Sequence, residues 1–89
     1  MELKFTRRLR TAGRFTIPHE IIDVLRIKHG DKIYFTIDDI PVPFAGVYSA
    51  DTRFTIPVNI RHLFNLRMND FIAVSISGID PVDLHGWVL

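Results

Sequence analysis

Short segments of alternating apolar and polar residues recur along the chain, and this alternation is typical of half-buried β-strands. It predicts strands at residues 3–10, 14–17, 32–37, 44–48, 53–56 and 71–77. Arg7 interrupts the first alternation, which favours a bulge or an edge strand there. Two segments, 19–25 and 57–64, instead carry apolar residues at helical spacing. Pro18 and Pro57 suit the first helical position, because proline has a fixed φ and no N–H. These elements predict a mostly β protein with two short helices.

The same pentapeptide, Arg-Phe-Thr-Ile-Pro, occurs at residues 14–18 and again at 53–57, a shift of 39 residues. Identical residues continue at this spacing beyond the pentapeptide, namely Ile21 and Ile60, Asp31 and Asp70, Ile33 and Ile72, and Ile37 and Ile76. The chain therefore contains two copies of one unit, at residues 3–38 and 42–77, followed by an extension at 78–89. A unit of this size buries too little surface to fold alone, so we expect one domain over residues 1–89 with a shared core.

The turn before the last strand of each copy has its own pattern. Gly30 in the first copy corresponds to Asn69 in the second. Glycine and asparagine are the residues that best tolerate left-handed backbone, so we expect that conformation at both positions, with the first helix ending before Lys28. Asp31 and Asp70 follow, and we interpret them as turn-capping residues in preference to catalytic ones. Residues 38–43 are predicted to be an extended linker, since two of them are prolines.

Composition restricts the setting more than the function. The hydrophobic content of 47% is typical of a globular chain, and the absence of cysteine excludes disulfides. There is no apolar run of transmembrane length and no signal peptide, so we expect a cytoplasmic protein with no membrane partner. Residues 1–14 carry five basic side chains and one acidic one, whereas residues 15–89 carry six basic and nine acidic ones. The net charge of +1 thus conceals a basic N-terminal segment of +4 and an acidic remainder of −3.

Sequence motifs for catalysis are lacking. His19-Glu20-Ile21-Ile22-Asp23 begins like the HExxH signature of zinc proteases, but Asp23 stands where the second histidine ligand is needed. No glycine-rich phosphate loop or nucleophile elbow is present either. We therefore expect no enzyme activity, no metal site and no cofactor.

Several of these residues together resemble the AbrB/MazE/SpoVT superfamily of swapped-hairpin DNA-binding domains. The resemblance lies in residues 13–18, 20–21, 25, 27–28 and 30–32, and it returns at 53–57, 60–61, 66 and 69–70. It implies a swapped-hairpin β-barrel built by the two tandem repeats, a single-chain pseudo-dimer that is monomeric or forms a higher homo-oligomer. It also implies a transcriptional regulator that binds double-stranded DNA.

The DNA-binding residues implied by the resemblance are unevenly divided between the copies. In the first copy Arg7, Arg8 and Arg14 match basic positions of the family, and Arg10 adds a charge. In the second copy Arg53 and Arg61 match, whereas Gly46 and Val47 replace Arg7 and Arg8. This division argues against symmetric, palindromic recognition. Two alternatives stay open: a solvated strand face, or structural pairing of Arg14 and Arg53 with acidic residues (Asp31, Asp51 or Asp70).

A second function of a different class is also compatible with the sequence. The near-neutral net charge and the lost basic positions favour a protein-interaction module whose barrel no longer binds DNA. The acidic and apolar segment around Trp87 resembles the tail with which antitoxins of the family bind their toxins. Alternatively, this segment packs back on the protein's own core.

Overall fold

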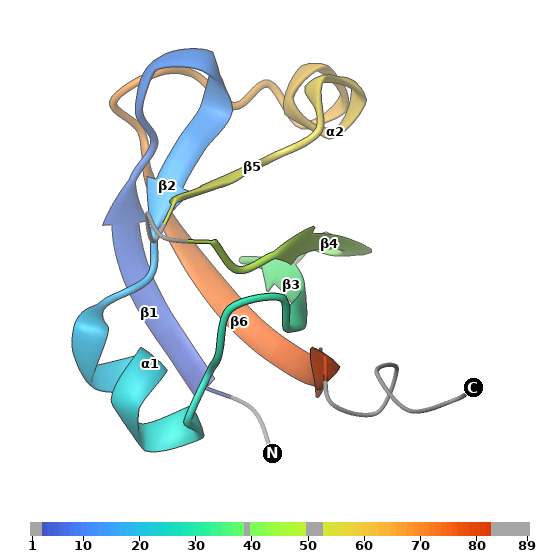
Figure 1. The fold of residues 1–89 in the computed structure, drawn as a ribbon. Helices are drawn as coiled ribbons and strands as arrows, with labels where there is room; N and C mark the ends of the chain where they lie inside the picture. Colours follow the sequence, from blue (N-terminus) through green and yellow to red (C-terminus); the bar gives the residue numbers. More distant parts are fainter. Residues whose placement is uncertain (1–2, 39, 50–52, 83–89) are drawn as a thin grey trace.

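Six strands form two antiparallel sheets in the computed structural model, which describes residues 3–38, 40–49 and 53–82 (Figure 1). The four-stranded sheet has the order β1 (Leu3–Arg8), β6 (Phe71–Asp80), β3 (Lys32–Ile37) and β4 (Ile40–Val47). A two-stranded sheet pairs β2 (Arg14–Thr16) with β5 (Arg53–Thr55). The helices are α1 (His19–Leu25) and α2 (Val58–Leu63). The predicted mostly β fold with two short helices is confirmed.

The strands of the two copies alternate in the large sheet. β1 of the first copy pairs with β6 of the second, and β4 of the second pairs with β3 of the first. The pair Arg8–Phe71 has its counterpart 39 residues along the chain in Val47–Lys32. The loop hydrogen bonds repeat in the same way: the Leu9 N–H donates to the Asp70 carbonyl at 2.8 Å, and the Tyr48 N–H donates to the Asp31 carbonyl at 2.9 Å. Each copy therefore completes its pairing only with strands from the other.

One core lies between the two sheets and takes side chains from both copies. Phe15 and Phe35 of the first copy meet Phe44 and Phe54 of the second, with ring centroids 5.0–6.1 Å apart. Buried aliphatic residues from both copies surround them: Leu9, Ile17, Ile22, Ile27, Ile33, Ile37, Ile56, Ile60, Ile72, Val74 and Ile76. Because each copy supplies half of the aromatic cluster, neither retains a closed core without the other.

Helix ends differ in detail from the sequence prediction. Pro18 and Pro57 are not the first helical residues but the N-caps, with ψ of 140° and 141°, and their carbonyls begin the helical hydrogen bonding. Helix α1 spans the predicted range His19–Leu25, and its C-cap Arg26 has a left-handed φ of 54°. The turn four residues later still needs positive φ, with values of 91° at Gly30 and 74° at Asn69. The left-handed backbone predicted at these two positions is thus confirmed.

Three strand boundaries also require correction. The first strand ends at Arg8, since Arg10 makes only an isolated bridge with Arg14 across the turn. The predicted linker 38–43 is largely part of β4, whose prolines are tolerated because β4 is an edge strand. Strand β6 runs to Asp80, so the first residues of the 78–89 extension belong to the sheet.

The expected closed barrel is not formed by the strand ladders of the described residues. β2 and β5 are three residues long and pair with each other, so they cannot join the edges of the large sheet by continuous ladders. β1 is one of these edges, as predicted from Arg7. Neither α1 nor α2 has the length and apolar character needed to cross a membrane.

Candidate nucleic-acid interface

Five of the six predicted arginines line two neighbouring hollows on the surface. A groove of about 400 Å³ is lined by Thr6, Arg7, Arg8, Arg10, Thr16 and Phe71. A second hollow of about 170 Å³ is lined by Arg10, Thr11, Arg14, Phe15, Thr16 and Arg53. The two share Arg10 and Thr16, and we call them together the arginine groove. No acidic side chain is among its lining residues in the part of the chain described here.

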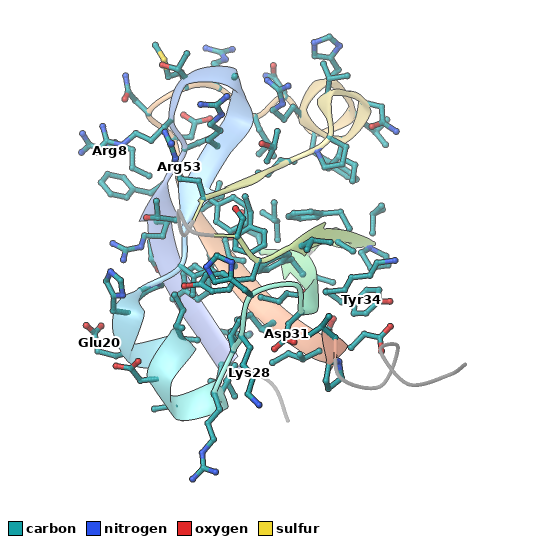
Figure 2. All side chains as sticks on the ribbon, viewed as in Figure 1. Arg8, Glu20, Lys28, Asp31, Tyr34 and Arg53 are labelled. Atoms are coloured by element: carbon teal, nitrogen blue, oxygen red, sulfur yellow. The ribbon has the colours of Figure 1, made fainter. Side chains whose placement is uncertain are left out.

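Three elements bring the arginines together. Strand β1 carries Arg7 and Arg8, and a 3₁₀ turn at Thr11–Gly13 reverses the chain so that the Arg10 N–H donates to the Arg14 carbonyl at 2.7 Å. The pairing of Thr16 with Arg53 adds an arginine from the second copy. Figure 2 shows Arg8 and Arg53 at the same end of the molecule, away from Lys28 and Asp31. The groove thus depends on contact between the two copies.

Two of the predicted arginines use their Nε atoms within the fold. Arg7 donates from Nε to the Thr16 carbonyl at 3.1 Å and so joins β1 to β2. Arg61 donates from Nε to the Ile56 carbonyl, also at 3.1 Å. The Arg61 side chain lies so close to Gly13 that a residue with a Cβ would not fit at position 13. Arg61 does not line the arginine groove. Arg7 and Arg61 therefore hold neighbouring elements in place as well as contributing charge.

The other groove arginines present their charge to solvent. Arg8, Arg10, Arg14 and Arg53 are all exposed. Within the described ranges the structure gives Arg8, Arg10 and Arg14 no carboxylate partner at ion-pair distance. Exposed cations that converge without a carboxylate partner among the described residues, as Arg8, Arg10 and Arg14 do, produce a positive potential that attracts polyanions.

Phe71 was missed by the sequence analysis as a functional residue. It starts β6 directly opposite Arg8, and the Arg8 guanidinium carbon lies 4.7 Å from the centre of its ring. The side chain is 67% exposed, whereas the other phenylalanines at strand positions are buried or half-buried. Its counterpart in the first copy is Lys32. Because a lysine at a strand position usually faces solvent, the repeat could have indicated that Phe71 faces solvent too.

The acidic residues proposed as alternative arginine partners serve their own turns. Asp31 accepts hydrogen bonds from the N–H groups of Lys28 at 2.8 Å and Val82 at 2.9 Å, and Asp70 accepts one from Arg67 at 2.9 Å. The turn-capping role predicted for both is confirmed. Asp51, the third proposed partner, lies outside the described residues, as does the segment around Trp87.

The second copy lacks three of the arginines that line the groove. Gly46, Val47 and Ser49 stand where the first copy has Arg7, Arg8 and Arg10. A Cβ at Gly46 would lie 2.6 Å from Cδ1 of Phe54, so packing between the sheets requires glycine there. The described residues contain no group of three or more His, Asp or Glu side chains that could hold a metal ion. The basic positions are therefore divided unevenly between the copies and are not duplicated, as the sequence indicated.

Comparisons with known proteins relate the chain to one solved structure. No model of a protein family matches the sequence, and no curated protein matches it either. The solution structure of PHS018 from Pyrococcus horikoshii has a similar fold, with a TM-score of 0.69 and 23% sequence identity. The match covers 88% of this chain and 91% of PHS018. At this identity the likeness establishes a shared fold. The likeness extends over nearly all of both chains.

Proposed function

We propose that this protein is a DNA-binding transcriptional regulator of the AbrB-like type, with the arginine groove as its contact surface for double-stranded DNA. The convergence of five arginines on the arginine groove, whose described lining residues include no acidic side chain, carries this proposal. Arginines that replace the counterions of DNA phosphates gain free energy from ion release, and this gain does not depend on sequence. The acidic balance of residues 15–89 supports the same assignment, since it concentrates attraction for a polyanion at this surface.

We also propose that the chain is a swapped-hairpin pseudo-dimer in which both halves are fused. The support is the exchange of partners in the large sheet, where β1 pairs with β6 and β3 with β4. The self-complementary pairing of Phe15 with Phe54 is what a twofold axis would produce at its centre. A fused pair is free to differentiate its halves, which accounts for basic side chains that are divided unevenly between them.

The groove residues have different roles in this proposal. Arg8, Arg10, Arg14 and Arg53 contact phosphates through exposed guanidinium groups. Arg7 supports the floor of the groove through its bond to Thr16, and Arg61 extends the basic surface beyond the groove. Phosphate contacts fix the position of a protein on the duplex but carry no sequence information. No catalytic step is involved.

Binding of a labelled duplex of mixed sequence tests the proposal. Arg8→Gln combined with Arg10→Gln should weaken binding by at least tenfold, because two phosphate contacts are lost. Arg26→Gln combined with Lys28→Gln removes the same charge near the end of α1, far from the groove, and should change binding much less. Equal losses in the two double variants would show that only net charge matters and would remove the groove from the proposal.

A protein-interaction module, including an antitoxin, is the second candidate. The observation that favours it is the exposure of large apolar side chains on and after α2: Val58, Leu63 and Met68. Exposed apolar residues that lie near one another are typical of surfaces that bind proteins. If the wild-type protein shows no salt-sensitive binding of duplex DNA, this function replaces the first one.

A further inference from the structure

We infer that the Arg8–Phe71 pair is a stacking site for an unpaired base, so that the arginine groove binds single-stranded nucleic acid in addition to duplex DNA. The inference rests on the proposed function, because it uses the same groove. It adds a ligand class, since proteins that bind single strands combine a basic groove for the backbone with aromatic rings for the bases.

The geometry of Phe71 suits this role. Arg8 and Phe71 face each other across the β1–β6 ladder, and the guanidinium lies over the ring at 4.7 Å. This contact fixes the ring orientation and occupies one of its faces. With 67% of the side chain exposed, the rest of the ring remains open to solvent within the groove. An aromatic ring held in place in this way offers a base a flat apolar surface at little cost in side-chain entropy.

The neighbouring groups match the other parts of a nucleotide. Arg7 and Arg10 line the same groove as Phe71, so they are placed to contact the flanking phosphates. Thr6 and Thr16 line it as well, and threonine hydroxyls can bond to sugar or base atoms. The base that stacks on Phe71 must be unpaired, because bases inside a duplex are already stacked on their neighbours.

The other half of the molecule supplies a built-in comparison. At the equivalent position Lys32 lies opposite Val47, which is 59% exposed. That pair also joins a cationic and an apolar residue across a ladder, but valine has no aromatic face, and the Lys32 Nζ lies over the ring of Tyr34 at 5.5 Å. If Arg8 only covered an apolar neighbour, an aliphatic residue would serve equally well at position 71.

The test compares a labelled oligothymidylate with a mixed-sequence duplex of equal length, using the full chain at one salt concentration. Phe71→Ala should weaken oligothymidylate binding about tenfold, in the range of a lost aromatic–base stack, and change duplex binding less than twofold. Phe71→Leu should show the same loss, since it keeps the apolar volume without the ring. Val47→Ala is the matched control and should leave both affinities unchanged.

An abasic oligonucleotide of the same length has the same phosphates but no bases, so a difference in affinity between it and oligothymidylate reports base contacts and not charge. The wild-type protein should bind it about tenfold more weakly than oligothymidylate, whereas Phe71→Ala should bind the two alike. Wild-type affinity of Phe71→Ala for oligothymidylate would overturn the stacking site. So would an equal loss on duplex and single strand, although duplex binding dependent on Arg8 and Arg10 would then still support the proposed function. Failure of the wild-type protein to bind either nucleic acid would overturn both.

Discussion

Asn69 shows how one backbone dihedral angle constrains a residue choice. Its φ of 74° corresponds to 91° at Gly30 in the first copy, and both precede a capping aspartate. We expect Asn69→Gly to be neutral or slightly stabilising, because glycine reaches positive φ without steric cost. Asn69→Val should reduce the free energy of unfolding by about 1 kcal/mol or more, since a β-branched residue is strained there. Urea denaturation measures both changes, and a neutral valine variant would contradict the assigned conformation.

The two capping aspartates are equivalent in sequence but not in surroundings. Asp31 is 4% exposed and accepts two backbone N–H groups, one of them from Val82 beyond the repeat. Asp70 is half-buried and accepts one. Asp31→Ala should therefore cost about 2–4 kcal/mol of unfolding free energy, since two partly buried hydrogen bonds to a carboxylate are lost, and Asp70→Ala about 1 kcal/mol, since one exposed bond is lost. Equal costs in urea denaturation would show that the Val82 contact contributes nothing.

Packing between the two sheets sets the requirement for glycine in β4. An alanine Cβ at position 46 would lie 2.6 Å from the Phe54 ring. This ring is buried in the core, so a shift away from the Cβ would disturb its neighbours. Gly46→Ala should thus cost about 1–3 kcal/mol through overpacking. Gly78→Ala in β6 is the control, since its Cβ would meet Tyr34 at 3.8 Å, an ordinary contact distance. Thermal unfolding of both variants measures the difference, and a Gly46→Ala protein as stable as Gly78→Ala would contradict the close approach of β4 to β5.

Element types were predictable from local pattern, whereas several boundaries were not. Alternation defined the strands near Phe35 and Val74 correctly, because side-chain period is a local property. The extension of β6 to Asp80 depends on pairing with Lys32 of β3, a contact that the sequence of residues 78–80 does not encode. The prolines of residues 38–43 suggested a linker, but an edge position allows them in β4.

At the scale of the whole molecule, the exchange of strands predicts mutual dependence of the copies. Residues 1–38 lack the partner strands of β1 and β3, and residues 39–89 lack those of β4 and β6. Each fragment alone should show no cooperative thermal transition, and mixing the two should restore one. Circular dichroism during heating measures this. A cooperative transition in either isolated fragment would contradict the shared core.

The candidate site was predictable in its residues but not in its shape. Counting charges located Arg7, Arg8, Arg10 and Arg14, because they are close in sequence. Other features could be seen only in the folded structure. Arg53 joins the groove through β5, whereas Arg61 does not line it. Phe71 faces Arg8. These contacts join the two copies, and sequence pattern alone does not specify which residues meet across such pairings.

The salt dependence of duplex binding tests the central claim most directly. Four exposed arginines (Arg8, Arg10, Arg14 and Arg53) that each neutralise one phosphate should give a slope of about −3.6 for the logarithm of the binding constant against that of salt concentration, from about −0.9 per phosphate. Arg8→Gln combined with Arg10→Gln should flatten this slope by nearly two units, and removal of residues 83–89 should leave it unchanged. A double variant that binds duplex DNA as tightly as the wild-type protein at every salt concentration would contradict the account.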